Sequence, residues 1–158
     1  MALTLLTTAT NKAEQYVAEM IGSDNDTDAL NAAWRVTHFA VTANGHDTGT
    51  GLALTPDPSL ECTDPLWCGG YTFLSGLYYK AITSYAYLTV KCPTFTCTID
   101  PNECVGNISQ ILLLGSLVGP AHPASPPPHF VAGVGNMNVQ TKGALDTWTF
   151  TLGMYMGV

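Results

Sequence analysis

The stretch FVAGVGNMNVQTKG, from Phe130 to Gly143, decides between two very different folds. Its Gly-x-Gly spacing is typical of a loop that binds a phosphate between a strand and a helix. The residues that follow Met137 alternate like a strand, and they lack both a third glycine and the Gly-Lys-Ser/Thr order of a phosphate loop. We therefore expect a strand here, in which the glycines allow a bend or the close approach of another backbone.

Regular alternation on both sides of this stretch predicts further strands. TFTCTI (94–99) and DTWTFTLGMYM (146–156) place apolar residues on one face and threonines on the other. ISQILLLGSL (108–117) is apolar on both faces, which favours a central strand that is covered on both sides. WRVTHFAV (34–41) predicts a strand with one face formed by Trp34, Val36, His38 and Ala40.

The N-terminal part predicts the only helix. Asn11 and Glu14 have the spacing of a capping box, and an apolar face follows over residues 10–22. Residues 56–79 are rich in proline and glycine and predict a long inserted loop. The expected fold is therefore mainly β, a single domain over residues 1–158 built as an antiparallel β-sandwich with one N-terminal α-helix.

Composition excludes several classes of function. Only 11% of the residues are charged and the net charge is −7, so the clustered Lys and Arg that nucleic acids or anionic membranes require are missing. The first residues lack the basic leader of a signal peptide, and the longest apolar run is about half of a bilayer span. We expect a soluble protein made in a cytoplasm, with the threonine-rich surface typical of a subunit packed among partners.

The five cysteines form no CxxC pair. An offset of five puts Cys92 and Cys97 on opposite faces of one strand, roughly 16 Å apart, which is too far for a disulfide. Free buried thiols are the favoured interpretation. The alternatives are a disulfide, such as Cys62–Cys68, and a zinc site. The fifth cysteine is Cys104.

The acidic segment DNDTD begins like a calcium loop, with Asp24, Asp26 and Asp28 at alternate positions. An EF-hand requires Gly at the sixth position and Glu at the twelfth, where this chain has Ala29 and Arg35. A solvated acidic turn is the preferred interpretation, and a looser calcium site is the alternative.

Candidate catalytic residues are scattered. His46 and Asp47 resemble half of a catalytic pair, yet no G-x-S-x-G motif accompanies them, and Ser75 in FLSGL lacks the first glycine of that motif. No carboxylate lies near His122 or His129 in sequence, and a histidine on a strand, such as His38, is more often packed than a ligand. We expect no catalytic residue, no metal, no cofactor and no enzyme activity.

Two loops are candidate interfaces with other proteins. An aromatic loop offers residues that are typical hot spots: Trp67, Tyr71, Phe73, Tyr78 and Tyr79. A stiff proline loop can dock at little entropic cost through Pro126, Pro127 and Pro128. The alternatives are that the aromatic residues cover one end of the sandwich and that the prolines form a surface turn.

From Trp34 onward the order of motifs resembles the N-terminal domain of bacteriophage tail-collar and tail-fibre proteins. The resemblance rests on THFAVTANG and its Gly/Asp turn, GNISQILLLG after an acidic turn, FVAGVGNM, TK and a final alternating strand. It implies a virion structural protein of the tail, baseplate, collar or fibre-attachment region, assembled in the host cytoplasm.

This expected role is oligomeric assembly with copies of itself and with other virion proteins, and contact with nucleic acid or membrane is not expected. No fibre shaft follows the last strand and the aromatic loop has no counterpart in the family, which favours an anchor, adaptor or collar subunit. The alternatives are a capsid decoration or minor capsid protein and a carbohydrate- or calcium-binding module.

Overall fold

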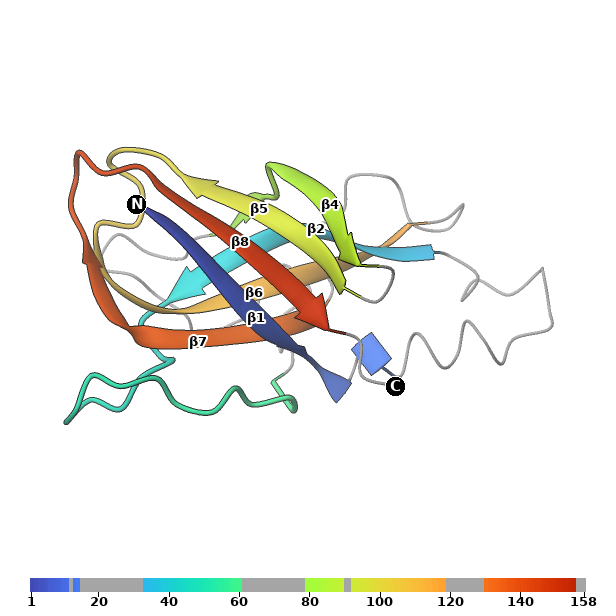
Figure 1. Ribbon diagram of the computed structural model, residues 1–158, viewed down its shortest axis with the longest axis horizontal. Coiled ribbons are helices and arrows are strands. Elements are labelled where there is room, and N and C mark those ends of the chain that lie inside the picture. The colour runs from blue at the N-terminus through green and yellow to red at the C-terminus, as the bar shows by residue number, and fades with distance from the viewer. Residues whose placement is uncertain (12, 15–32, 61–78, 90–91, 119–129, 156–158) are drawn as a thin grey trace.

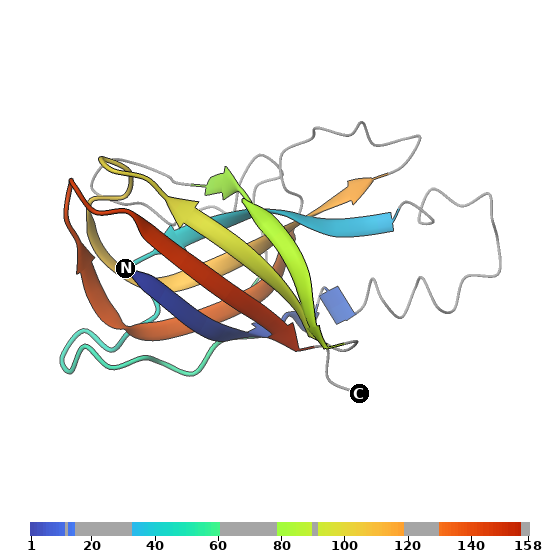
Figure 2. The same ribbon diagram turned by 45° about the horizontal axis from the view of Figure 1, so that its top comes forward.

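The computed structural model is a single curled β-sheet (Figures 1 and 2). It describes residues 1–11, 13–14, 33–60, 79–89, 92–118 and 130–155. Eight strands follow one another along the chain: β1 (Ala2–Ala9), β2 (Ala33–Thr42), β3 (Tyr79–Ala81), β4 (Ser84–Thr89), β5 (Cys92–Ile99), β6 (Gly106–Val118), β7 (Phe130–Lys142) and β8 (Trp148–Tyr155). The prediction of a mainly β fold is confirmed.

The strand order is β3-β2-β6-β7-β1-β8-β5-β4, and the pairs are antiparallel except for one. β1 runs parallel to β8 over seven residue pairs, so the expectation of a purely antiparallel sheet is wrong at this place. The topology supplies the reason. β1 lies between β7 and β8, which follow each other in the chain, and a strand inserted into such a hairpin must be parallel to one of its arms.

The two ends of the sheet are joined by residues 79–89. β3 pairs with β2 and β4 pairs with β5, while the two residues between them bond to opposite ends of the sheet. Ile82 donates its amide to the Thr37 carbonyl at 3.1 Å, and Thr83 donates to the Thr96 carbonyl at 2.7 Å. The expected facing layers are thus opposite walls of one continuous sheet, and two separate sandwich sheets are not confirmed.

The main core lies inside this curled sheet. It is built from the alternate residues of β2, β5, β6, β7 and β8 that point inward, among them Phe39, Phe95, Ile111, Leu113, Phe130, Phe150 and Leu152. A second buried cluster lies on the outer face of β2, β6 and β7 and contains Ala40, Leu112, Leu114, Val131 and Val134, with Leu60 packed against it. The middle of β6 is therefore buried on both faces, as the apolar run from Ile111 to Leu114 predicts.

A bulge in β2 changes the predicted faces of that strand. Simple alternation puts Val36 and Ala40 on the same side. The register of β2 against β6 shifts between Val36 and His38, so Val36 joins the main core while Ala40 joins the outer cluster. An extra residue in one strand flips the alternation beyond it, and here that residue is Thr37, whose carbonyl accepts the bond that joins the sheet ends.

The N-terminal segment differs from the expected start of the chain. Residues before the expected helix form strand β1, which the sequence did not indicate. Thr10, rather than Asn11, caps the following turn: its Oγ1 accepts from the Ala13 amide at 3.2 Å and its carbonyl accepts from the Glu14 amide at 3.1 Å. The described residues contain no complete helix, and residues 15–22 of the predicted helix lie outside them.

Candidate functional site

The glycine segment that resembles a phosphate loop lies inside strand β7, and a turn and strand β8 follow it. A side chain at Gly133 would lie 3.1 Å from Thr7 Oγ1, and one at Gly135 would lie 3.0 Å from Thr7 Cγ2. The two glycines therefore let β1 approach β7, with which it pairs at Thr8 and Ala9. This confirms the strand and excludes a phosphate-binding helix N-terminus at this position.

His46 has a serine neighbour that the sequence did not indicate. Its Nδ1 lies 2.8 Å from the Ser109 Oγ, and that oxygen also accepts the Gly45 amide at 3.0 Å. The tautomer of His46 determines which of the two groups donates in this hydrogen bond. Ser109 is fully buried, so a substrate has no access to it as a nucleophile.

Asp47 does not complete a catalytic triad with this pair. Its Oδ1 accepts from the Thr50 hydroxyl and amide, both at 2.8 Å, and from the Gly49 amide at 3.1 Å. These bonds, the Thr50 hydroxyl first, lower the pKa of the carboxyl below its usual value. Asp47 is thus a turn-forming residue that stabilises the hairpin over residues 46–53, as its hydrogen bonds satisfy the turn amides.

A polar network fastens this hairpin to the outer face of the sheet. Thr42 Oγ1 donates to Gln110 Oε1, Gln110 Nε2 donates to Asn136 Oδ1, and Asn136 Nδ2 donates to the Leu54 carbonyl. The bonds are 3.0–3.1 Å long. Residues 43–60 therefore cover the outer face of β6 and β7 as part of the fold.

The other candidate histidine and acidic residues that the structure describes do not form a catalytic or metal-binding group. His38 is half-buried, its Nδ1 lies 2.8 Å from Thr37 Oγ1, and burial lowers the pKa of its ring. Within the described ranges no group of three or more His, Cys, Asp or Glu could hold a metal ion. The remaining candidates lie outside the described residues: Asp24, Asp26, Asp28, Ser75, His122 and His129.

Three of the five cysteines are free and buried, namely Cys92, Cys97 and Cys104. Burial raises the pKa of the Cys97 thiol to about 12, and burial followed by the nearby Glu103 carboxylate raises that of Cys104 to about 12. Such thiols are inert as nucleophiles. The favoured interpretation is confirmed for these three, while Cys62 and Cys68 lie outside the described residues.

The strongest cluster of charges surrounds the turn between β5 and β6. Lys80 Nζ lies 2.6 Å from Asp100 Oδ2 and 3.0 Å from Glu103 Oε2. The Asp100 hydrogen bond is the largest cause of a raised pKa at Lys80, so its amine stays protonated and is no nucleophile. Lys142 is fully buried and donates to the Asp100 carbonyl at 3.0 Å. The cluster holds the turn in place.

The outer face of β1, β8, β5 and β4 has a different character, and we call it the threonine face. None of these four neighbouring strands contains a charged residue. Thr4, Thr151, Thr96 and Ser84 are register partners and form one row of hydroxyls across all four strands. The face consists of Ala2, Thr4, Leu6, Thr8, Ser84, Ala86, Thr94, Thr96, Thr98, Thr149 and Thr151, all exposed or half-buried.

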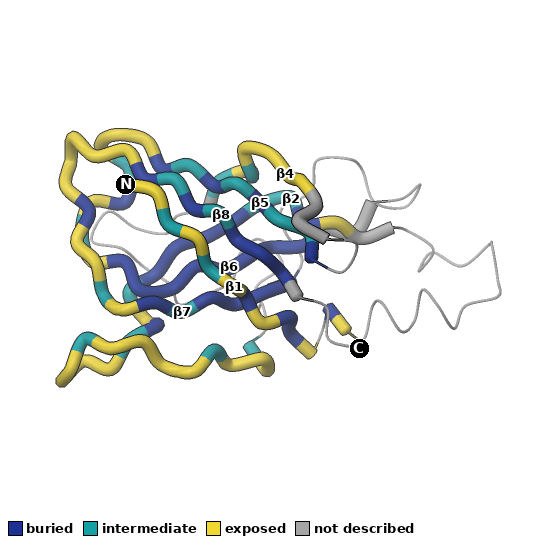
Figure 3. Tube along the Cα trace, viewed as in Figure 1, coloured by how far each residue is buried: buried dark blue, intermediate teal, exposed yellow. Residues whose placement is uncertain are grey.

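Leu6 is the prominent apolar residue of the threonine face, with 72% of its surface exposed. It lies over Gly153 of β8, where a Cβ would come within 3.2 Å of the leucine side chain. In Figure 3 the tube of β1 alternates between exposed and more buried residues, while residues 108–115 of β6 and 130–135 of β7 are buried. Among the described residues, an uncharged and exposed face thus lies beside a wall that is largely buried.

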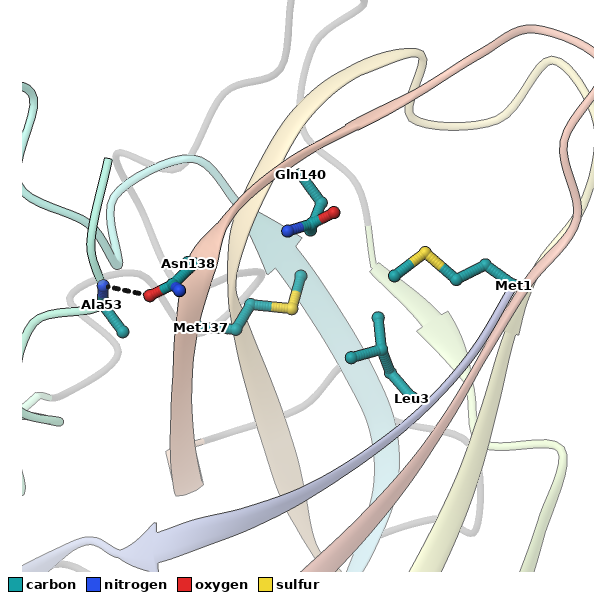
Figure 4. A pocket seen from close by; sticks show the side chains of 6 residues that line it. All are labelled: Met1, Leu3, Ala53, Met137, Asn138 and Gln140. Carbon is teal, nitrogen blue, oxygen red and sulfur yellow. Dashed lines mark hydrogen bonds between the residues drawn. The ribbon is translucent and has the colours of Figure 1, made fainter. Parts of the chain in front are cut away.

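A second feature lies at the edge of this face, where β1 and β7 separate. We call it the β1–β7 gap. It holds a cavity of about 370 Å³ lined by Met1, Leu3, Ala53, Met137, Asn138 and Gln140. Figure 4 shows the side chains of Met1, Leu3 and Met137 directed toward one another across the gap. None of these residue types is a general base or a nucleophile at neutral pH, so the cavity is suited to binding rather than catalysis.

The candidate interface residues are mostly beyond the described part of the chain. This applies to Trp67, Tyr71, Phe73 and Tyr78 of the aromatic loop and to Pro126, Pro127 and Pro128. Tyr79 begins β3, where its backbone pairs with Ala40. The aromatic and proline surfaces therefore stay predictions, and the threonine face and the β1–β7 gap are the surfaces that the sequence did not single out.

Comparison with known proteins gives no relative for this chain: no family model, no curated protein and no solved structure matches it. Among the described residues, no helix is long and apolar enough to cross a membrane.

Proposed function

We propose that this chain is a structural protein of a bacteriophage virion, in the tail, baseplate, collar or fibre-attachment region, and that it acts by oligomeric assembly. The observation that carries the proposal is the threonine face, a wall of four strands without a charged residue. The phage context comes from the resemblance of THFAVTANG, GNISQILLLG and FVAGVGNM to tail-collar and tail-fibre domains.

Charge is the physical reason to assign this face to assembly. The chain carries 12 acidic and 5 basic residues, so two copies repel each other wherever acidic side chains meet. The centres of protein interfaces are depleted of charged residues, because desolvating an unpaired charge is costly. The threonine face is the surface on which copies of this acidic chain can pack with the least repulsion.

The size of the face indicates how many contacts assembly needs. Four strands about 4.8 Å apart and about eight residues long cover roughly 500 Å². A typical stable interface uses about 800 Å² of each partner. One threonine face is therefore smaller than a usual interface. A closed ring, in which each subunit packs this face against a second, different surface of its neighbour, suits it better than an isolated dimer.

We also propose that the N-terminal segment forms the α-helix predicted over residues 10–22. The turn that Thr10 caps would continue as the helix over residues 10–22, because Tyr16, Val17 and Met20 supply the apolar face that such a helix needs.

Mass spectrometry of purified phage particles tests the proposal directly. We expect peptides of this chain in particles, at a copy number that is a multiple of a small ring, and antibody labelling at the tail or neck. Absence of the chain from particles would overturn the virion role, and labelling spread over the head would replace the tail assignment by a capsid one.

A further inference from the structure

The β1–β7 gap exists because β7 bonds to another partner at this place. Its register against β6 shifts between Ile108 and Gln110, where β7 contains two extra residues. The extra residues direct β7 toward the hairpin: the Val139 amide donates to the Gly51 carbonyl at 3.0 Å, and Asn138 Oδ1 accepts the Ala53 amide at 2.9 Å. Within the described residues β1 consequently pairs with β7 only at Thr8 and Ala9.

This separation leaves one edge of β1 without a neighbouring strand. Successive residues of a strand direct their N–H and C=O groups to opposite neighbours. The Met1 carbonyl accepts the Thr149 amide of β8, whereas the Thr10 amide donates to Ala132 at the end of β7. The backbone N–H and C=O groups of the even-numbered residues therefore face the gap, whereas their side chains lie on the threonine face. Ala2, Thr4 and Leu6 thus present a row of backbone donors and acceptors beside the cavity.

We propose that the β1–β7 gap is a docking slot for an extended peptide segment of a neighbouring virion protein, a segment with apolar side chains at alternate positions and basic residues at its flanks. The row of backbone groups on β1 requires an extended backbone as its complement, which is the chemistry of strand addition. The cavity between Leu3 and Met137 accepts one apolar side chain of that segment.

Charge around the gap selects the flanks of the peptide. The hairpin on one border carries the fully exposed Asp47, and the β7–β8 loop on another carries the exposed Asp146. The nearest lysine of β7, Lys142, is buried and bonded to the Asp100 carbonyl. The exposed Met1 ammonium also lies at the gap and donates to the Thr147 carbonyl at 2.9 Å. Two carboxylates therefore outnumber one amine at the borders of a chain with net charge −7, and basic flanks are favoured over acidic ones.

This slot rests on the proposed function, because it supplies the kind of contact by which a virion subunit holds its neighbour. Strand addition uses an edge and a cavity, whereas the threonine face uses flat packing of side chains. The two surfaces share Ala2, Thr4 and Leu6, but the slot uses their backbone groups and the threonine face uses their side chains. Met137 belongs to the slot alone and Thr151 to the threonine face alone, so substitutions at these two residues separate the surfaces.

A fluorescent peptide, acetyl-Lys-Thr-Val-Thr-Leu-Thr-Lys-amide, tests the slot by anisotropy with the intact chain. We expect saturable binding that weakens as salt is raised, and at least tenfold weaker binding when glutamate replaces both lysines or proline replaces the central threonine. Absence of saturable binding, or equal binding of all three peptides, would overturn the inference.

Substitutions in the chain locate the binding. Met137→Trp fills the cavity and should weaken the peptide at least tenfold, whereas Met137→Leu, which conserves volume, should change binding less than threefold. Thr4→Pro removes an amide that faces the gap and keeps the pairing with β8, so we expect a loss of about five- to tenfold. Unchanged binding in both Met137→Trp and Thr4→Pro, with the native circular dichroism spectrum retained, would overturn the slot.

The peptide assay and the particle assay fail separately. A chain that binds the peptide but is absent from particles keeps the slot and loses the virion role. A chain found in particles whose peptide binding is insensitive to these substitutions keeps the virion role and loses the slot.

Discussion

The two walls of the sheet differ in what lies on their outer faces. The wall formed by β2, β6 and β7 has a buried apolar cluster on each face, and the segment over residues 43–60 covers its outer side through hydrogen bonds such as Asn136 to the Leu54 carbonyl. The wall formed by β1, β8, β5 and β4 is apolar only inside, and its outer side is an uncharged array of threonines. One wall is completed by the chain itself, and the other faces outward with no charge to keep a neighbour away.

The two walls should therefore respond differently to substitution, one in the stability of the fold and the other in assembly. Substitution of a residue on either side of β6 removes buried volume, because both sides are enclosed. Substitution on the outer side of β8 removes little, because Thr151 is only half-buried. The first wall therefore determines whether the chain folds, and the second can change association while the fold is retained.

Truncation of the buried leucines of β6 should lower stability more than any other substitution considered. Leu112→Ala and Leu113→Ala lie on opposite faces of β6, and each should lower the free energy of unfolding by about 2–5 kcal/mol because both leucines are fully buried. Urea unfolding followed by tryptophan fluorescence measures both. A cost below about 1 kcal/mol for Leu112→Ala would show that the outer face of β6 is not enclosed.

Two lysines at the β5–β6 turn allow a buried interaction to be compared with an exposed one. Lys142→Met leaves the Asp100 carbonyl without its buried donor and should cost about 1–3 kcal/mol. Lys80→Met breaks a pair in which both side chains are about one third or more exposed, and should cost less than about 1 kcal/mol. Unfolding midpoints at pH 7 compare them, and a larger loss for Lys80→Met would contradict the assignment of Lys142 to the structure of the turn.

The buried thiol of Cys97 predicts how stability depends on alkaline pH. Its pKa is about 9 when the chain is unfolded and about 12 in the fold, so the unfolded state loses the proton first as pH rises. The stability is fully present below pH 9 and falls between pH 9 and pH 12. The urea midpoint should fall between pH 8 and pH 10.5 in the unchanged chain, and this fall should be smaller in Cys97→Ala, which lacks the thiol. Equal losses in both proteins would exclude this thiol as a cause.

The rate at which the cysteines react with an alkylating reagent tests whether their thiols are buried. Cys92, Cys97 and Cys104 should resist iodoacetamide at pH 8 until the chain is unfolded, because each thiol is buried. Peptide mapping by mass spectrometry assigns each site. Rapid labelling of Cys97 in the folded chain would show that the interior of the sheet is open to solvent.

Local patterns in the sequence predicted the strands that have regular alternation or an unbroken apolar run. Phe95, Cys97 and Ile99 point inward, and β6 is central, because side-chain periodicity alone determines these features. The strand β1 escaped prediction because Leu5, Leu6, Thr7 and Thr8 do not alternate, and their places are set by pairing with β8, which is distant in sequence. The bulge at Thr37 has the same kind of cause, since it depends on the joining of the sheet ends.

The surfaces proposed for binding were harder to predict than the core. The threonine face emerges only when strands from both ends of the chain lie side by side, so that Thr4, Thr96 and Thr151 form one row. The β1–β7 gap depends on a two-residue bulge near Met137, which no local pattern signals. The pair of His46 and Ser109 joins residues 63 positions apart, and a lone His-Asp dipeptide in the sequence does not reveal it.

Substitution on the threonine face should have the smallest effect on stability. It also tests directly whether this face is the surface of assembly. Thr151→Lys puts a charge in the middle of the hydroxyl row and should change the free energy of unfolding by no more than about 0.5 kcal/mol. Thr48→Lys, which makes the same change at an exposed turn residue outside this face, is the matched control. Native mass spectrometry of the three proteins should give an oligomer for the unchanged chain and for Thr48→Lys, and a monomer for Thr151→Lys. The same oligomer in all three, or a monomeric unchanged chain, would contradict the account.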